Sequence, residues 1–167
     1  MKYQLSFSKY DSKYRNELGH YLRDDWTSIW DVGKVCEGVL VTLEEYERVE
    51  NQYLKTLEEV AKLFYVDSFQ IARLDKHDTD WTYLGFPVEV GATVTIEQFL
   101  ILSRLTLREE IWVSFEHPDL WVNFALDYYA YLGFNRSSDA IHRIIEANSL
   151  FWEKDKFDFY DEDDDEE

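Results

Sequence analysis

The sequence predicts an α+β fold, with a mostly antiparallel sheet packed against about three helices and followed by an acidic disordered tail. Two stretches have the three- and four-residue apolar spacing of helices, and each begins with a capping motif. Short β-rich runs stand before, between and after these stretches, and one pair of runs is separated only by turn residues. The resulting order, β–α–β–α–β–β–α–β, is typical of the α+β class.

The chain begins with an alternating segment. Residues 3–7 (YQLSF) place apolar side chains at every second position, which predicts a strand with one buried face. The next segment is ambiguous, although residues 16–23 could form a short helix. The stretch DDWTSIWDVGK at residues 24–34 follows, with a turn at Gly33 and a further glycine at Gly38.

A long amphipathic helix is predicted to begin after Thr42. The Thr42 hydroxyl can accept a hydrogen bond from the Glu45 amide, and the Glu45 carboxylate can reach back to the Thr42 amide, as in a capping box. Apolar residues then recur at helical spacing for about six turns. They are Leu43, Tyr46, Val49, Tyr53, Leu57, Val60 and Phe64.

A strand, a loop and a second helix are expected next. Residues 69–74 are typical of a strand, and the polar residues 75–94 are typical of a loop that could hold a short extended piece. Thr95 and Gln98 repeat the capping pattern and begin a helix that continues to about residue 108. Because this helix is apolar nearly all round, we expect it to be buried on most faces.

The following region predicts a hairpin. Residues 111–116 and 120–124 are β-rich, and they flank the turn residues His117, Pro118 and Asp119. Residues 128–132 either continue the second strand or begin another.

A last helix, a closing strand and a tail complete the chain. Ser138 can cap the helix, which turns its isoleucines inward, and residues 149–153 are the candidate strand. No Pro/Gly-rich linker is present, so we expect residues 1–155 to form a single α+β domain. Residues 156–167 are predicted to be an acidic tail without stable structure.

The net charge limits the possible partners. The chain has 35 acidic and 17 basic side chains, which give a formal net charge of −18. The last seven residues are all acidic, and the 28 acidic and 17 basic side chains before them still leave −11. Such a field repels nucleic acid and anionic membranes and attracts basic proteins. We therefore expect a basic protein partner, no nucleic acid and no membrane; acidity that only maintains solubility is the alternative interpretation.

The remaining sequence features favour a cytoplasmic location. A single cysteine, Cys36, excludes an internal disulfide and fits a reducing compartment. No run of about 18 apolar residues is present, and the first residues alternate rather than form the apolar block of a signal peptide.

No catalytic or metal-binding pattern stands out. Cys36 has no Cys-x-x-Cys partner, and residues 77–80 (HDTD) have an unspecific spacing that fits a solvated loop. We therefore expect no catalytic residues, no metal and no cofactor. An enzyme is the least favoured class.

The acidic, aromatic stretch at residues 24–31 is the leading candidate for a binding surface. Trp26 and Trp30 would share one face of a helix, where they could be core residues or interface hot spots. The surrounding aspartates would suit Lys or Arg on a partner, and a partner's Arg could add about 1 kcal/mol by cation–π contact. With outward carboxylates of the long helix included, the candidate partner-binding residues are Asp24, Asp25, Trp26, Trp30, Asp31, Glu44, Glu47 and Glu58.

Three groups of segments, taken together, carry a resemblance to a known family. They are residues 26–34 (WTSIWDVGK) followed by 41–46 (VTLEEY), residues 107–112 (LREEIW) followed by 126–131 (LDYYAY), and residues 149–153 (SLFWE). In this order they resemble a family of small bacterial α+β proteins associated with immunity to bacterial toxins. The likeness covers about residues 1–155. Two positions depart from the pattern: Trp30 replaces a small or polar residue, and Leu126 replaces a glycine.

The resemblance implies an intracellular inhibitor that binds and blocks a cognate toxin domain. The leading hypothesis is therefore an immunity-type protein that acts through an acidic, aromatic surface. An acidic nucleic-acid mimic that inhibits a DNA-binding enzyme is one alternative, although a mimic needs carboxylates spaced like phosphates and the acids here are interleaved with bases. A structural or interaction domain is the other alternative.

Overall fold

The computed structural model describes residues 1–137 and 139–154. The predicted Ser138 cap and the acidic tail at residues 156–167 lie outside this part of the chain. The strands within it are β1 (Tyr3–Ser8), β2 (Val35–Cys36), β3 (Val39–Leu40), β4 (Ser68–Asp75), β5 (Thr93–Thr95), β6 (Trp112–His117), β7 (Leu120–Ala125), β8 (Tyr129–Phe134) and β9 (Phe151–Lys154). The helices are α1 (Leu43–Leu63), α2 (Ile96–Leu107) and α3 (Asp139–Ala147), and the short 3₁₀ turns are η1 (Ser12–Tyr14), η2 (Ile29–Asp31), η3 (Thr82–Leu84) and η4 (Leu126–Tyr128).

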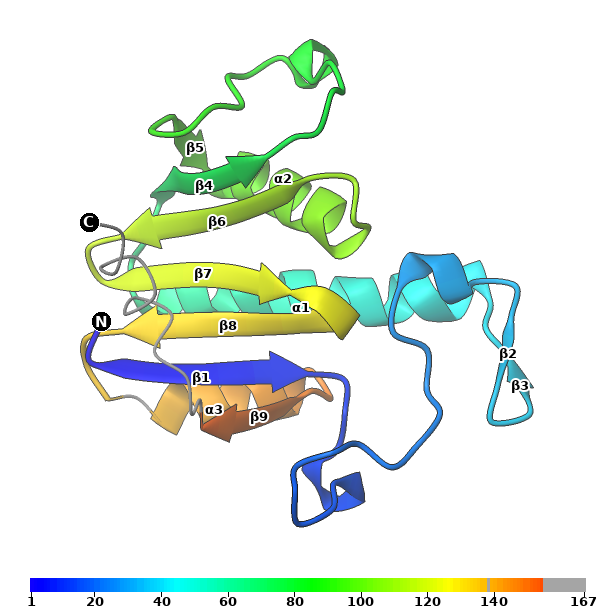
Figure 1. Cartoon of the computed structure of the whole chain (residues 1–167). Coiled ribbons are helices and arrows are strands. Elements are labelled where there is room, and N and C mark those ends of the chain that lie inside the picture. Colours follow the sequence, from blue (N-terminus) through cyan, green and yellow to red (C-terminus); the bar gives the residue numbers. More distant parts are fainter. Residues whose placement is uncertain (138, 155–167) are drawn as a thin grey trace, which may run out of the picture.

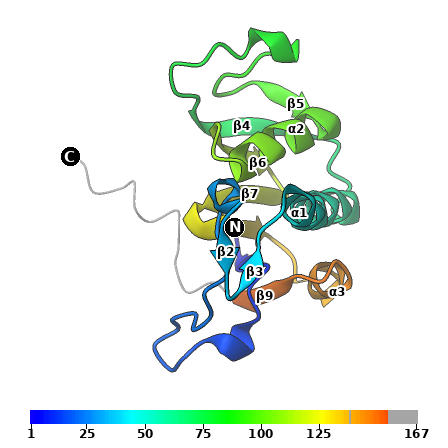
Figure 2. The same ribbon diagram turned by 90° about the vertical axis from the view of Figure 1, so that its right-hand side faces the viewer.

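Seven of the strands form one antiparallel sheet in the order β5-β4-β6-β7-β8-β1-β9, whereas β2 and β3 pair only with each other. The three helices lie on one face of the large sheet (Figures 1 and 2). The predicted α+β class is therefore confirmed. Among residues 1–137 and 139–154, no helix is long and apolar enough to cross a membrane.

The core lies between the sheet and the helices. Alternate strand residues point to this side, as the pleat requires. Leu5 and Phe7 of β1 are buried, and their register partners on β8 are Leu132 and Ala130, which are also buried. The Phe7 ring lies 5.4 Å from the ring of Tyr53, which α1 contributes from the helical layer.

α1 confirms the long helix that the apolar spacing predicts. The Thr42 hydroxyl accepts from the Glu45 amide (3.1 Å), but the Glu45 carboxylate binds Arg48 (2.7 Å) instead of completing the capping box. A charged residue on the inner side, Glu50, is buried and accepts two hydrogen bonds from Arg108 (2.7 and 2.8 Å). This pair fastens α1 to the C-terminal end of α2.

Residues 16–23, which the sequence left ambiguous, do not form the short helix that was considered for them. The Asn16 side chain accepts hydrogen bonds from the amides of Leu18 (3.0 Å) and His20 (2.9 Å), and Gly19 adopts φ 82°. An asparagine that binds its own following backbone favours a turn over a helix. The segment is therefore a tight loop.

After residue 68, the structure decides between the two alternatives that the sequence left for residues 128–132. Residues 128–132 belong to a separate strand, β8, which follows the η4 turn. The loop at 75–94 contains η3 and ends in the short strand β5. The capping box of Thr95 and Gln98 is complete at the start of α2. The expected burial of α2 on most faces is only partly right, because Ile101 is exposed.

Candidate protein-binding surface

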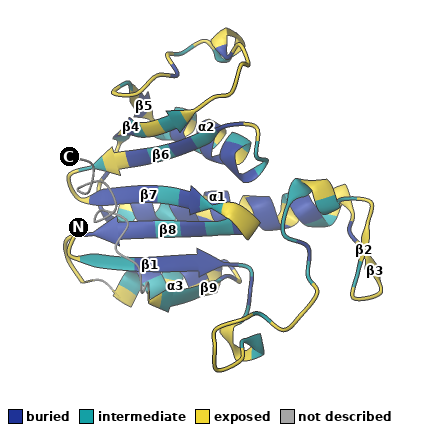
Figure 3. Ribbon diagram, viewed as in Figure 1, coloured by how far each residue is buried: buried dark blue, intermediate teal, exposed yellow. Residues whose placement is uncertain are grey.

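Residues 22–42 form an extended connection, here named the arm, which contains η2 and the β2–β3 hairpin. The hairpin projects beyond the end of the sheet (Figure 1), and most of it is exposed (Figure 3). The arm and the first residue of α1 carry several exposed large apolar side chains, namely Leu22, Trp30, Val35, Val39, Leu40 and Leu43. So many exposed large apolar side chains on one short segment favour a protein-binding role for the arm.

The structure separates the two tryptophans that the sequence singles out. Trp26 is only 5% exposed, whereas Trp30 is 70% exposed. The segment is not an α-helix, because Ser28 is extended (φ −156°, ψ 169°) and caps a 3₁₀ turn. The Ser28 hydroxyl accepts from the Trp30 amide (3.0 Å), and the Asp31 carboxylate accepts from the Thr27 amide (2.8 Å). The rings therefore do not share a face, and only Trp30 is available to a partner.

Trp26 packs into an aromatic cluster at the base of the arm. Its ring centroid lies 5.3 Å from that of Tyr46 and 5.2 Å from that of Tyr128. The Lys9 ammonium lies 3.8 Å from the Trp26 ring centroid. The cation–π contact that the sequence suggested for an incoming arginine is thus made within the chain, and Trp26 acts as an anchor.

Lys9 and Asp25 fasten the arm to the end of β1. The Lys9 ammonium lies 2.8 Å from the Asp25 carboxylate, and its side chain is only 7% exposed. Burial lowers the pKa of Lys9, although Asp25 acts in the opposite direction. Asp25 is therefore committed to an internal contact.

A second ion pair fixes the tip of the arm. Glu37 binds Arg23 (2.6 Å) and accepts from the Asp24 amide (3.1 Å), and the contact with Arg23 lowers the pKa of Glu37. Glu37 and Gly38 both have positive φ (50° and 77°), as the two-residue turn of a tight hairpin requires. This Glu-Gly pair between two apolar dipeptides is the signal that could have predicted the hairpin and its exposed valines and leucine.

The remaining predicted carboxylates divide into two groups. Asp24 and Glu44 are exposed, and neither forms an ion pair with another described residue. The others have partners within the chain. Asp31 binds Lys34 (3.3 Å), Glu47 lies 3.7 Å from Arg108, and Glu58 binds Lys62 (2.8 Å).

Asp31 lies within the arm, whereas Glu58 lies far along α1. Burial alone would raise the pKa of Asp31. Hydrogen bonds from the Thr27 and Ser28 amides and the nearby Lys34 ammonium outweigh this effect, so the pKa of Asp31 is lowered.

Glu58 lies 14 residues beyond Glu44, or about 21 Å along α1 at 1.5 Å per residue. The structure therefore does not bring Glu58 to the arm.

The arm offers little for covalent or metal chemistry. Partial burial and the neighbouring Asp31, Asp24 and Asp25 raise the pKa of the Cys36 thiol, which makes it a poor nucleophile near neutral pH. Within the part of the chain that the structure describes, no group of three His, Cys, Asp or Glu side chains is placed to hold a metal ion.

Comparison of the chain with protein-family models, with curated proteins and with solved structures gives no match. The geometry and charge of the arm are therefore the structural basis for assigning a function.

Proposed function

We propose that the protein is an immunity-type inhibitor that binds and neutralises a basic bacterial toxin domain, with the arm as its contact surface. The observation that carries this proposal is the exposure of Trp30 (70%), on an arm that carries several other exposed apolar side chains. Tryptophan is among the residues most enriched at interface hot spots.

The electrostatics of the chain suit a basic partner. The net charge is −18, and Asp24 and Glu44 are exposed carboxylates of the arm and of the start of α1 that form no ion pair with another residue among 1–137 and 139–154. Opposite charges on a partner would accelerate association and orient it. Inhibition then needs only that the bound protein covers the toxin's functional cleft. The proposal places the protein in the cytoplasm, where such an inhibitor meets its target.

The arm is also preorganised for binding. The Lys9–Asp25 and Arg23–Glu37 pairs and the buried Trp26 hold it in place without using its exposed apolar side chains. A surface that is already ordered loses less conformational entropy when it binds. This supports a role as a contact surface rather than a loose connection.

The test combines protection in cells with binding in solution. A candidate toxin domain encoded beside this gene would be expressed with and without the protein, and cell survival would be scored. Trp30→Ala should weaken binding by at least about 2 kcal/mol, roughly 30-fold, in calorimetry. The matched control is Tyr83→Ala, which removes another exposed ring (68% exposed) from a loop outside the arm. Absence of protection, or equal affinities for the two variants, would contradict the proposal.

A further inference from the structure

The β2–β3 hairpin exposes apolar side chains on both of its faces. Residues directly opposite each other in an antiparallel pair lie on the same face, so Val35 and Leu40 share one face, and Cys36 and Val39 share the other. Val35 and Leu40 are 63% and 56% exposed, and Val39 is 68% exposed. A flat partner would therefore cover only one of the two apolar faces.

The second face is exposed because the hairpin projects beyond the end of the sheet (Figure 1). Val41 lies on the same face as Val39 but two residues nearer the base, and it is buried in the core. Cys36 is half-buried, and Val39 is exposed. Burial on this face therefore decreases from the base to the tip. At roughly 3.4 Å per residue, the chain from Val41 to the turn at Gly38 spans about 10 Å.

Contacts at the base and at the tip hold the hairpin in this position. At the base, the Gly33 amide donates to the Val41 carbonyl (2.8 Å), and the Val41 amide donates to the Lys34 carbonyl (2.8 Å). At the tip, Arg23 binds Glu37. An isolated two-stranded hairpin is only marginally stable in water, so these contacts keep it ordered. The exposed apolar side chains remain available to a partner.

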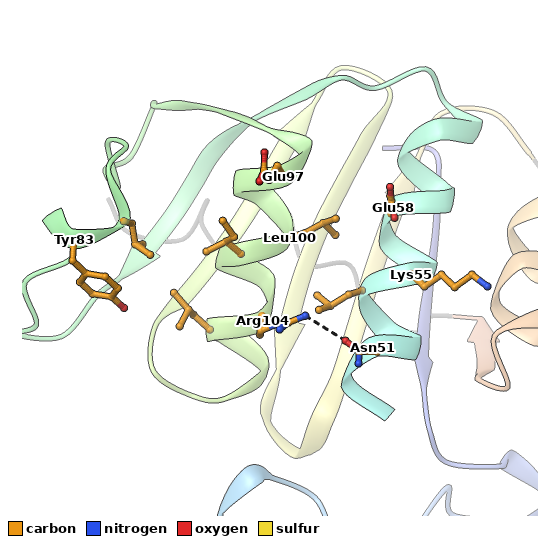
Figure 4. A pocket seen from close by; sticks show the side chains of 11 residues that line it. Asn51, Lys55, Glu58, Tyr83, Glu97, Leu100 and Arg104 are labelled. Atoms are coloured by element: carbon orange, nitrogen blue, oxygen red, sulfur yellow. Dashed lines mark hydrogen bonds between the residues drawn. The ribbon is translucent and has the colours of Figure 1, made fainter. Parts of the chain in front are cut away.

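The hairpin differs in shape from a second apolar surface, the groove between α1 and η3. This groove has a volume of about 630 Å³, and Leu100 of α2 is one of the residues that line it (Figure 4). Two of its charged residues have partners within the chain, since Arg104 donates to the Asn51 side-chain oxygen (3.3 Å) and Glu58 binds Lys62 (2.8 Å). A groove receives a projecting element, whereas the hairpin is itself the projecting element and needs a cleft in its partner.

An exposed acidic residue lies beside the tip of the hairpin. The Asp24 amide donates to the Glu37 carboxylate (3.1 Å), which places Asp24 next to the turn. The Glu37 carboxylate itself is bound by Arg23 (2.6 Å), so Asp24 supplies the negative charge there. Lys or Arg side chains at the rim of a partner's cleft would complement this charge.

We propose that the β2–β3 hairpin enters a cleft of the toxin domain, with apolar walls on both sides of the hairpin and basic residues near Asp24. This inference deepens the inhibitor function proposed above and rests on it. A cleft about 10 Å deep would cover Val35 and Leu40 with one wall and Val39 with the other. Removal of these side chains from water favours association.

Three valine-to-threonine variants of the full chain test this geometry, and calorimetry with the toxin domain encoded beside this gene measures their affinities. Threonine is branched like valine and also favours strands, so the hairpin should keep its fold. Val35→Thr and Val39→Thr should each weaken binding about tenfold, because each buries a hydroxyl against an apolar wall. The matched control is Val90→Thr, which is also 63% exposed but lies outside the arm, and it should leave the affinity unchanged.

Several results would overturn the proposal. Weaker binding of only one of the two hairpin variants would show that the partner contacts one face. Unchanged binding of both variants would show that the hairpin is not buried. Sedimentation of the protein alone could also reveal self-association that Val35→Thr and Val39→Thr dissolve, and the hairpin would then bind a second copy of this chain.

The same measurements separate this inference from the function on which it rests. If Trp30→Ala weakens binding but the two hairpin variants do not, the inhibitor function stands and the insertion is wrong. If the toxin domain is not bound at all, both are wrong.

The charge at the tip has its own test. Asp24→Asn should slow association with the toxin domain at low salt and leave the dissociation rate nearly unchanged, as expected for a charge at the rim of an interface. An unchanged association rate would contradict the basic residues proposed near Asp24.

Discussion

The helix-covered sheet and the arm use large apolar side chains in opposite ways. In the sheet and helices these side chains are buried and contact one another, as in the cluster of Phe69, Phe99 and Phe115, whose centroids are 4.4 to 6.2 Å apart. In the arm most are exposed, and ion pairs such as Arg23–Glu37 fix the backbone. The difference teaches that the shape of the arm does not depend on its exposed apolar residues. Substitutions in the two regions should therefore affect different measurements, stability in one and binding in the other.

The largest expected effect breaks the junction between the two regions. Trp26→Ala should lower the free energy of unfolding by about 4 kcal/mol, because it removes a buried ring packed on Tyr46, Tyr128 and the Lys9 ammonium. Urea denaturation measures this change. Trp26→Phe keeps part of the packing and should cost clearly less. A loss below about 1 kcal/mol for Trp26→Ala would mean that the arm is not anchored here.

A smaller effect tests the helical layer alone. Arg108→Ala should destabilise the protein by about 3 kcal/mol, because it removes the close ion pair of the buried Glu50 carboxylate (2.7 Å) and leaves the more distant Arg104 (3.4 Å). Arg48→Ala is the control, since it removes an exposed pair with Glu45 and should cost less than about 0.5 kcal/mol. Similar losses in the two variants would show that Glu50 is not dependent on its partner.

The buried tyrosines beneath the arm predict a loss of stability at alkaline pH. Burial raises the pKa of Tyr53, whose hydroxyl accepts from the Lys9 amide (2.7 Å) and donates to the Tyr128 carbonyl (2.7 Å). Below about pH 10 both states keep this proton, so the contribution is fully present. At higher pH the unfolded state loses its proton first, and stability falls by up to about 1.4 kcal/mol per pH unit for each such tyrosine.

Tyr53→Phe removes one of these ionisable hydroxyl groups. The free energy of unfolding of this variant should therefore fall less steeply between about pH 10 and 11.5 than that of the unsubstituted protein. Lys9, with its lowered pKa, acts in the opposite direction but is present in both proteins. Tyr65→Phe is the control, because Tyr65 is 89% exposed. Identical slopes for all three proteins would contradict the prediction.

The smallest expected effect on stability comes from the other tryptophan. Trp30→Ala should change the free energy of unfolding by less than about 0.5 kcal/mol, because its ring is exposed and the Ser28 cap binds only its amide. Thermal and urea unfolding would measure this change alongside Trp26→Ala. A large loss of stability would mean that the Trp30 ring stabilises the arm, either in addition to contacting a partner or instead of it.

Local signals predicted most of the sheet and the helices. The Thr95–Gln98 capping box and the apolar spacing of α1 act within a few residues, so both appear directly in the sequence. The absence of a helix at residues 16–23, a segment that the sequence left ambiguous, has an equally local cause. One asparagine side chain and a left-handed glycine outweigh the helical propensity of their neighbours.

The candidate site was less predictable because it depends on contacts between distant segments. Lys9 and Asp25 meet only after β1 and the arm have packed together, and this contact turns Asp25 inward and encloses Trp26. Spacing alone placed Trp26 and Trp30 on one face because it assumed a helix. It also grouped Glu58 with Glu44, although a straight helix keeps them apart.

The position of β1 has a consequence for the synthesis of the protein. Its two neighbours in the sheet are β8 and β9, and its register joins Tyr3 to Phe134 on one side and Ser8 to Phe151 on the other. At typical translation rates the ribosome needs on the order of ten seconds to make the intervening chain. Such high contact order delays closure of the sheet until late in translation. During that interval β1 has no partner strand, and its apolar residues could pair with the wrong segment. Chaperones that bind exposed strands would reduce this mispairing.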